Sequence, residues 1–358
     1  MKFLFCQPGL TNKANVDCLI KNLIKRSLKL NNKDYLEINS LNKKNRDSIK
    51  LKKYFFISKK ISLIVNGLIF FFKLKDLIKI RRVSHIFFDG YTIFDLFFFS
   101  ILNFSKKTKL IIYLRIPYDQ IYYTKYIFNI SVKNLKKKEN VVFITDTNNL
   151  KNHFKKNFKI NSTILPIPGE SQNKCKFNKI NIKNLNILFP GKSRDEKGTK
   201  NIIQMFKNSD LKDNVFFSFA ENKTIVNKLD DVKNLRLISL NPNLNYKSFI
   251  LSIKKADIIL LPYTHQSYRL RSSGIFIDTI KLNKLLFVPH LTWMSQILKK
   301  YELDKLVIKK WSIDIILSRL VYINKNFKSF YKKYQIMHAE LSKNNSNIKY
   351  ITNFKKII

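Results

Sequence analysis

The chain has 358 residues, which is long enough for two domains of ordinary size. Its formal net charge at pH 7 is +44. Its three cysteines, Cys6, Cys18 and Cys175, show no CxxC spacing, which argues against a disulfide scaffold or a zinc site and suits a reducing compartment.

The first half alternates apolar runs, typical of buried strands, with segments of helical spacing. Strands are expected at 2–6, 35–38, 85–89, 109–115, 141–145 and 162–165. Helices are expected at 15–30, 92–103, 122–137 and 148–158, with Lys-rich helical material over 48–80. Repeated strand–helix–strand units with continuously apolar strands predict a parallel sheet covered on both faces.

The alternation breaks at Pro166-Ile-Pro-Gly, which predicts a linker at 169–184 after an N-terminal domain of residues 1–168. It then resumes over 185–310, with strands expected at 187–189, 215–220, 235–238, 257–261 and 286–288. Helices are expected there at 199–208, 222–230, 246–255, 273–282 and 293–300. We therefore predict an α/β fold with two Rossmann-like, doubly wound parallel-sheet domains facing across a cleft. Residues 311–358 are predicted to be helical and to pack back on the N-terminal domain, with a frayed Lys- and Asn-rich end.

The excess of lysine accompanies many Asn, Ile and Phe residues, a bias typical of AT-rich genomes, so solvated lysine-covered faces are the favoured interpretation of the charge. Contact with an anionic membrane is the alternative. Nucleic acid is not an expected partner, because the aromatic residues lie in apolar strands and do not alternate with basic ones. The N-terminus has no long apolar stretch and no cleavage site, and the apolar runs at 61–72 and 93–102 are too short to span a bilayer. We expect a cytoplasmic protein, with a location at the inner membrane face as the alternative.

Two strand-to-helix junctions of the second domain carry the candidate chemistry. In the first, the strand at 187–189 ends in Pro-Gly, and a short loop follows with Lys192, Arg194 and Lys197. In the second, Arg271 and the run Ser272-Ser273-Gly274 open a helix. Free backbone N–H groups and the positive end of a helix dipole bind phosphate, and both junctions belong at the carboxyl edge of one sheet. We expect them to converge on one anion, a nucleotide diphosphate. The alternatives are a solvated basic loop and a simple helix cap.

A P-loop is excluded, although Pro190-Gly191-Lys192-Ser193 is similar to the end of one. The first glycine of that motif would be residue 186, which is Asn186, and the intervening residues form a strand.

The two junctions resemble signatures of GT-B glycosyltransferases of the retaining "group 1" lineage. That family's Gly-Arg-x-x-x-x-Lys-Gly appears here as Gly191-Lys192 followed by Lys197-Gly198. Its second signature has two acids seven residues apart, of which Asp278 matches the second and Arg271 stands in place of the first. The family's Gly-Lys-Pro-Val is replaced by the run from Asn283 to Leu286, which keeps the following strand but loses Gly and Pro.

The resemblance implies a role for each matched residue. Lys192 and Lys197 would stabilise charge in catalysis and, with Arg194, would bind the donor diphosphate. Asp278 would accept hydrogen bonds from the donor ribose; the alternative is a surface acid beside Lys281 and Lys284. The remaining diphosphate candidates are Ser272, Ser273, Gly274 and Arg271. Arg271 or Arg269 would take the place of the missing acid. The ligand of that arginine would be either a phosphate or an acidic sugar, and the sequence does not choose between them.

In the first half, Arg115 occupies the place where the family often has a catalytic histidine. Because arginine stays protonated, it would act as a cation and not as a base. The loop after the first strand would approach the reacting sugar and the acceptor, and further acceptor contacts would come from acids at strand ends. These candidates are Gly9, Asn12, Asn15, Asp89 and Asp119, whereas Asp146 is expected to be a helix cap.

The sequence thus predicts transfer of a hexose from a nucleoside-diphosphate sugar to an acceptor hydroxyl, without metal and with no cofactor besides the nucleotide sugar as co-substrate. Retention of anomeric configuration, and an acceptor that is a glycan or lipid-linked glycan in surface polysaccharide or glycolipid synthesis, are implied by the resemblance alone. The five histidines are scattered, with no metal-ligand spacing. A non-catalytic nucleotide-sugar- or phosphate-binding module of a membrane-associated assembly is the alternative function.

Overall fold

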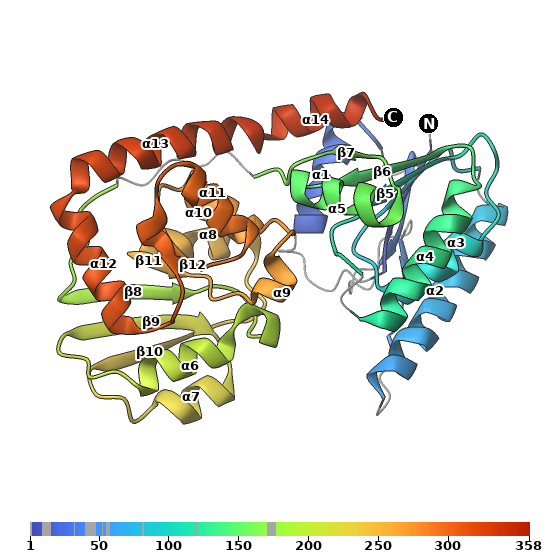
Figure 1. Cartoon of the computed structure of the whole chain (residues 1–358). Coiled ribbons are helices and arrows are strands. Elements are labelled where there is room, and N and C mark those ends of the chain that lie inside the picture. The colour runs from blue at the N-terminus through green and yellow to red at the C-terminus, as the bar shows by residue number, and fades with distance from the viewer. Residues whose placement is uncertain are drawn as a thin grey trace. The chain divides into compact units, whose positions relative to one another are not determined.

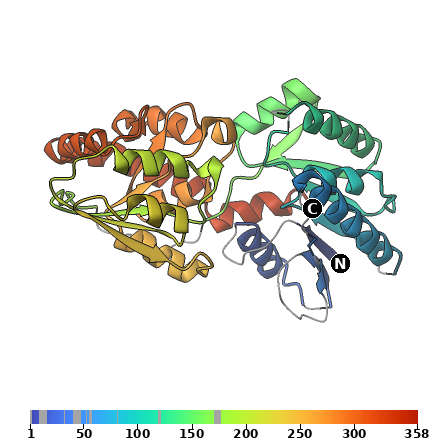
Figure 2. The ribbon, with the colours of Figure 1, turned by 90° about the horizontal axis from the view of Figure 1, so that it is seen from below.

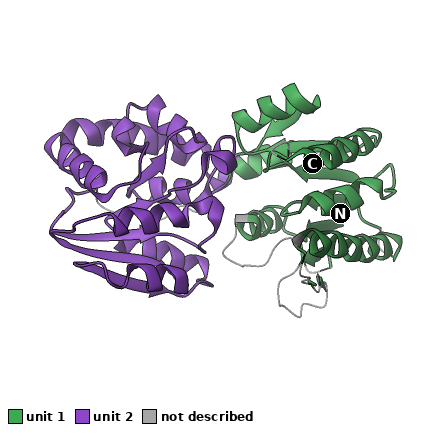
Figure 3. Cartoon of the chain, turned by 60° about the horizontal axis from the view of Figure 1, so that its bottom comes forward, with its two compact units in different colours: residues 1–167, 350–358 green, residues 168–349 purple. Residues whose placement is uncertain are grey.

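The computed structural model describes residues 2–8, 16–31, 33–39, 48–51, 53–54, 58–80, 82–118, 121–169 and 177–358. The chain divides into two compact units (Figure 3): unit 1 is Met1–Ile167 with Tyr350–Ile358, and unit 2 is Pro168–Lys349. Unit 2 runs past the expected domain end at residue 310, and residues 170–176 of the expected linker lie outside the described residues.

Unit 1 is built on a seven-stranded sheet of parallel strands in the order β3-β2-β1-β4-β5-β6-β7. The strands are β1 (Phe3–Gln7), β2 (Tyr35–Asn39), β3 (Ser48–Lys50), β4 (His85–Phe88), β5 (Lys109–Tyr113), β6 (Val141–Thr145) and β7 (Ser162–Ile164). The prediction of helix from residue 48 is wrong at its start, because β3 pairs with the end of β2 at the sheet edge. A strand of three residues is too short to show the alternation of apolar and polar residues that would predict it.

Helices cover both faces of this sheet, because successive strand residues point to opposite sides. They are α1 (Val16–Ser27), α2 (Lys59–Ile80), α3 (Ile93–Ile101), α4 (Tyr122–Lys136), α5 (Asn148–Phe158) and α14 (Asn347–Lys355). Phe87 packs on Phe354 of α14 with ring centroids 5.9 Å apart, whereas Phe88 stacks on Phe99 of α3 at 4.2 Å. Helix α3 lies between α2 and α4 (Figure 1 and Figure 2).

Unit 2 contains a six-stranded parallel sheet in the order β10-β9-β8-β11-β12-β13. Its strands are β8 (Asn184–Phe189), β9 (Asn214–Ala220), β10 (Leu235–Leu240), β11 (Ile258–Leu260), β12 (Leu285–Pro289) and β13 (Val307–Ile308). Its helices are α6 (Thr199–Lys207), α7 (Lys223–Leu229), α8 (Tyr246–Lys255), α9 (His265–Tyr268), α10 (Gly274–Lys281), α11 (Trp293–Lys300), α12 (Ile313–Lys325) and α13 (Phe327–Asn344). The prediction of two parallel-sheet α/β domains is confirmed. Helix α9 and strand β13 are not among the expected elements, and each is too short for a periodic signal.

The end of the chain differs from the prediction of a frayed tail, because residues 347–355 form helix α14. Tyr350 and Phe354 are buried, at 2% and 0% exposed, in the core that also contains Phe3 and Phe87 of the first sheet. The aromatic residues at this spacing lie on one face of a helix and bury it, whereas the surrounding Lys and Asn residues concealed that pattern. None of the described helices combines the length and the apolar character needed to cross a bilayer.

Candidate functional site

The first junction of unit 2 runs from the end of β8 through the 3₁₀ turn η1 (Asp195–Lys197) into α6. Gly198 joins η1 to α6 and has φ +75°. It lies against the segment after β11, because a Cβ on this residue would be 1.8 Å from the Pro262 carbonyl oxygen. The Thr264 N–H also donates to the Glu196 carbonyl at 2.9 Å. The loop after β8 and the segment after β11 are therefore in direct contact, as the two-junction hypothesis requires.

Lys197 lies inside this contact, with only 6% of its surface exposed. Its Nζ donates to the Pro190 carbonyl at 3.4 Å and lies 5.6 Å from the ring centroid of Tyr263. Gly191, at φ +80°, leaves room for it, because a Cβ there would lie 2.6 Å from Nζ. Within the part of the chain that the structure describes, Lys197 makes no ion pair.

Electrostatics around Lys197 disfavour its charge. Burial first, and then the positive charges of Arg194 and Arg271, lower its pKa to about 8, with Glu196 opposing them. The three basic groups repel one another, Glu196 offsets only part of that repulsion, and a bound anion would reduce it further. The net positive environment of Lys197 agrees with the anion that the two-junction hypothesis places there.

The second junction meets the first at Tyr263. Ser273 caps α10, its Oγ accepting from the Phe276 N–H at 3.2 Å, so the helix cap that was the alternative for this residue is present. A side-chain hydrogen bond joins Ser273 to Tyr263, and the charges of Arg194 and Arg271 both act on the Tyr263 hydroxyl. Lys197 and Ser273, 76 positions apart by subtraction of their numbers, thus contact the same tyrosine.

The other predicted diphosphate ligands lie around these two residues in different settings. Lys192 is exposed on the loop, and Arg194 is largely exposed and pairs with Glu196 at 3.1 Å. The guanidinium of Arg271 lies over the Tyr268 ring at 5.0 Å. Ser272 is buried, Gly274 is the first residue of α10, and Arg269 is exposed at the end of α9. The structure therefore brings the basic residues of both junctions to one carboxyl edge of the sheet.

Asp278, the predicted ribose ligand, is half-buried on α10. Its Oδ1 accepts a hydrogen bond from the Tyr246 hydroxyl at 3.0 Å, which fixes the carboxylate. The neighbouring lysines bond to main-chain oxygens, Lys281 to Gly169 at 2.5 Å and Lys284 to Ala256 at 2.7 Å. Asp278 is thus held in place by an aromatic hydroxyl and is more than a solvated surface acid.

Sequence reasoning missed two residues of this site. Tyr263 has no local signal, because it follows an apolar strand as many core residues do. Its burial raises its pKa well above the usual value. Ser193 follows the two residues that matched the family signature, and its Oγ is buried without a hydrogen-bond partner among the described residues. A hydroxyl in that state, beside a basic loop, is a further group that a phosphate can satisfy.

Unit 1 presents a cluster of charged residues at the carboxyl edge of its own sheet. Arg115 follows β5, and its Nη1 pairs with Asp17 at the start of α1. Its Nε lies 3.6 Å from the carboxylate of Asp146, which follows β6. Burial opposes the charge of Arg115, but Asp17, Asp89 and Asp146 together raise its pKa. The cation that was predicted to act in catalysis is therefore engaged by two carboxylates, and Thr147, not Asp146, caps α5.

Asp89 completes this cluster, and its carboxyl group is protonated more readily than is usual for an aspartate. Burial raises its pKa well above the usual range, the charge of Asp17 adds to this, and Arg115 opposes it. The Gly90 N–H donates to its Oδ1 at 2.7 Å, and a side-chain hydrogen bond links it to Asp17. The Tyr350 hydroxyl, which interacts electrostatically with Asp89, is buried without a hydrogen-bond partner among the described residues.

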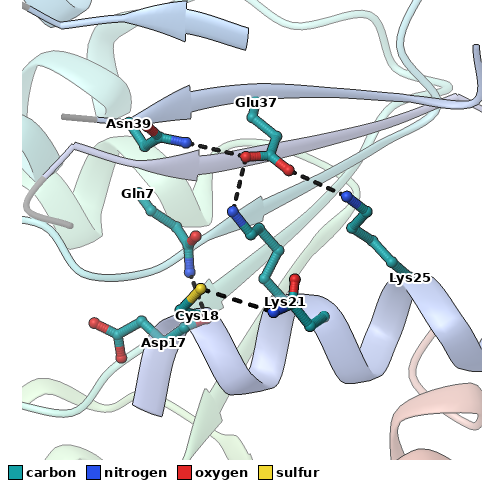
Figure 4. A network of polar contacts seen from close by, with 8 residues as sticks. Gln7, Asp17, Cys18, Lys21, Lys25, Glu37 and Asn39 are labelled. Carbon is teal, nitrogen blue, oxygen red and sulfur yellow. Dashed lines mark hydrogen bonds and ion pairs between the residues drawn. The ribbon is translucent and has the colours of Figure 1, made fainter. Parts of the chain in front are cut away.

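A buried polar network orients α1 and hence Asp17 (Figure 4). Glu37 on β2 accepts from Lys21 at 2.7 Å and from Lys25 at 3.3 Å, both on α1. Gln7, at the end of β1, donates from Nε2 to the Asp17 carbonyl at 2.9 Å. These bonds hold the helix against two neighbouring strands and fix the direction of its first turn. No sequence motif and no hydrophobic periodicity predicts that orientation.

Four predicted acceptor-side residues, Gly9, Asn12, Asn15 and Asp119, lie outside the described residues. Among the residues that the structure does describe, no group of three or more His, Cys, Asp or Glu side chains is arranged to hold a metal ion.

No protein-family model matches the chain, and no curated protein matches its sequence significantly. Solved structures do match over the whole length. Anabaena HepE in complex with UDP-glucose has a TM-score of 0.68 at 10% identity, covering 99% of this chain and 98% of that one. A glycosyltransferase from Rickettsia africae has 0.63 at 12% identity, covering 99% and 97%. The lipopolysaccharide outer core galactosyltransferase WaaB has 0.62 at 9% identity, covering 100% and 99%. These likenesses show the fold, and the GT-B architecture that the resemblance implied is confirmed.

Proposed function

We propose that this chain is a glycosyltransferase that moves a hexose from a nucleoside-diphosphate sugar to an acceptor hydroxyl. The observation that carries the proposal is the meeting of Lys197 and the capped start of α10 at Tyr263, with Arg194 and Arg271 close by. A buried cation without an ion pair, next to a helix N-terminus, is a site for a dianionic group. Among the solved structures of this fold, HepE is bound to UDP-glucose, which supports a UDP-sugar as donor.

The chemistry follows from where charge develops. When the sugar leaves its donor, negative charge accumulates on the departing diphosphate. Lys197, Arg194 and the N–H groups at the start of α10 stabilise that charge in place, so that fixed cations supply what a metal supplies in other transferases. Asp278, held by Tyr246, receives the ribose hydroxyls. Retention of configuration is part of the proposal and follows the family resemblance.

The acceptor hydroxyl is assigned to the carboxyl edge of the first sheet. There a side-chain hydrogen bond joins Asp17 to Asp89, and the raised pKa of Asp89 favours the neutral form that can donate such a bond. The acceptor class that we propose is a glycan or lipid-linked glycan at the cytoplasmic face of a membrane, as part of surface polysaccharide or glycolipid synthesis. The description of WaaB as a lipopolysaccharide galactosyltransferase supports this class.

A catalytically silent binding module remains the second candidate. The specific observation in its favour is that Arg271 stands where the family has its first acid, while Arg115, at the usual histidine position, is engaged by Asp17 and Asp146. Such a module would bind the same nucleotide sugars without forming a product.

The first test is a thermal-shift screen of the full chain with UDP, GDP and their hexose derivatives, followed by turnover assays with those that bind. Binding at a hundred times the dissociation constant stabilises a protein by about 2.7 kcal/mol, which gives a melting shift of several degrees. Stabilisation with product formation is expected. Stabilisation without product would select the binding module, and no stabilisation at millimolar levels would exclude both candidates.

The lowered pKa of Lys197 gives a pH dependence of donor binding. A bound diphosphate favours the protonated amine, so binding takes up a proton above about pH 8. We expect the dissociation constant of UDP-glucose to be nearly constant below that pH and to rise by up to about tenfold per pH unit above it. Calorimetry from about pH 7 to about pH 10 measures this, with Lys197→Arg as the control, since arginine stays charged. If the dissociation constant depended on pH equally in both proteins, Lys197 would not be the group that titrates.

A further inference from the structure

Helix α2 of unit 1 has an apolar surface that the described residues leave exposed. Phe70, Leu74 and Leu77 point inward and are buried. The opposite face carries Ile61, Ile64, Leu68 and Phe72, which are 36–57% exposed. These four positions, spaced by three or four residues, form one stripe along the helix, here called the α2 stripe. A helix that is apolar on both faces is normally buried all round or lies against lipid.

Basic residues continue and flank the stripe. Lys75 and Lys79 are exposed and extend the same face at the same spacing. At the other end of the helix, the Nζ of Lys60 lies 4.8 Å from the ring centroid of Tyr123 on α4. Next to that tyrosine, Tyr122 is 86% exposed. Apolar side chains bordered by lysines and an exposed tyrosine are the composition of a helix that lies in a membrane interface.

We propose that the α2 stripe docks on an anionic lipid bilayer, with α2 lying in the plane of the interface. Charge complementarity selects this occupant. A second copy seated on the stripe would bring the lysines of both chains together in a protein of net charge +44, whereas anionic headgroups neutralise them. The proposal goes beyond sugar transfer and does not depend on it, because lipid binding is measured without any donor or acceptor.

The test is co-sedimentation of the full chain with vesicles of phosphatidylcholine alone or mixed with phosphatidylglycerol. Binding to the mixed vesicles is expected, and Leu68→Glu/Phe72→Glu is expected to weaken it about tenfold or more. Val321→Glu/Ile336→Glu in unit 2 is the matched control, since these side chains are 40% and 56% exposed, against 36% for Leu68 and 57% for Phe72. The control should bind as the unchanged protein does.

The contribution of charge is tested by a second matched pair. Lys75→Gln/Lys79→Gln should weaken binding to the mixed vesicles about tenfold, whereas Lys325→Gln/Lys328→Gln, at exposed positions of unit 2, should not. Both variants lose the same number of charges, so a difference between them locates the contact on α2. Equal losses would mean that overall charge alone attracts the protein, and would overturn the proposal.

Insertion is tested by fluorescence. The emission of Phe72→Trp should shift to the blue when mixed vesicles are added, and that of Ile336→Trp should not. Circular dichroism of each variant establishes that it is folded. Two results would overturn the proposal: no vesicle binding by the unchanged protein, or a lipid-free dimer that Phe72→Glu dissociates, since the stripe would then be covered by a second copy.

Discussion

Replacing Lys197 by methionine is expected to remove most of the sugar transfer and, at the same time, to stabilise unit 2 against heat. The loss follows from the position of Nζ, which is buried at the meeting point of the two junctions. Removal of one preorganised charge-stabilising group typically lowers turnover by about a hundredfold to a thousandfold. Steady-state assays with the donor identified in the screen measure this loss. Unchanged turnover would remove Lys197 from the mechanism.

The gain in stability follows from the pKa of Lys197. Folding lowers it from 10.5 to about 8, so at neutral pH the unfolded chain holds the proton more tightly than the folded one. Keeping the amine charged in the fold costs on the order of 3 kcal/mol below about pH 8, and this cost disappears as the pH rises towards 10.5. Lys197→Met should therefore melt several degrees higher at neutral pH, and the difference should shrink at high pH. Lys192→Met, in the exposed part of the same loop, should change the melting temperature little.

Replacing Arg115 by methionine is expected to destabilise unit 1 strongly. The guanidinium pairs with Asp17 and Asp146, both of them buried, and its removal leaves two carboxylates without their cation. Breaking a buried ion pair on one side typically costs about 3–5 kcal/mol. Denaturant unfolding should show this loss at neutral pH. Arg26→Met, at an exposed position of α1, should leave the stability nearly unchanged.

The effect of Arg115→Met should also depend on pH in a definite direction. Without the cation, Asp17 and Asp146 are left as buried carboxylates with no balancing charge, and protonation removes that cost. The variant should therefore regain stability as the pH falls towards about 5. A stable variant with lost activity would instead support the catalytic role that the sequence position suggested.

Both sheets were predictable because buried parallel strands are continuously apolar and are separated by amphipathic helices. The meeting of the two basic junctions was predictable for a related reason: strand ends of one parallel sheet share an edge, so motifs distant in sequence meet there. Lys197 and Ser273 illustrate this, since their joint contact with Tyr263 follows from topology.

What could not be predicted depends on contacts that have no local signal. Nothing near Arg115 in sequence indicates that Asp17 neutralises it, because Asp17 lies 98 positions away on α1. Tyr263 resembles any core aromatic until its neighbours are known. The helix at 347–355 was hidden because its few buried aromatic residues stand among lysines and asparagines, and only the sheet that they cover gives them a partner.

The position of α14 has a consequence for synthesis of the chain. Phe3 and Phe87 of the first sheet are covered by Phe354, a residue that leaves the ribosome only after all of unit 2 has been made. During translation, unit 1 therefore exposes an aromatic face that later residues bury. Such a nascent chain is a substrate for chaperones and is prone to aggregation if elongation stalls.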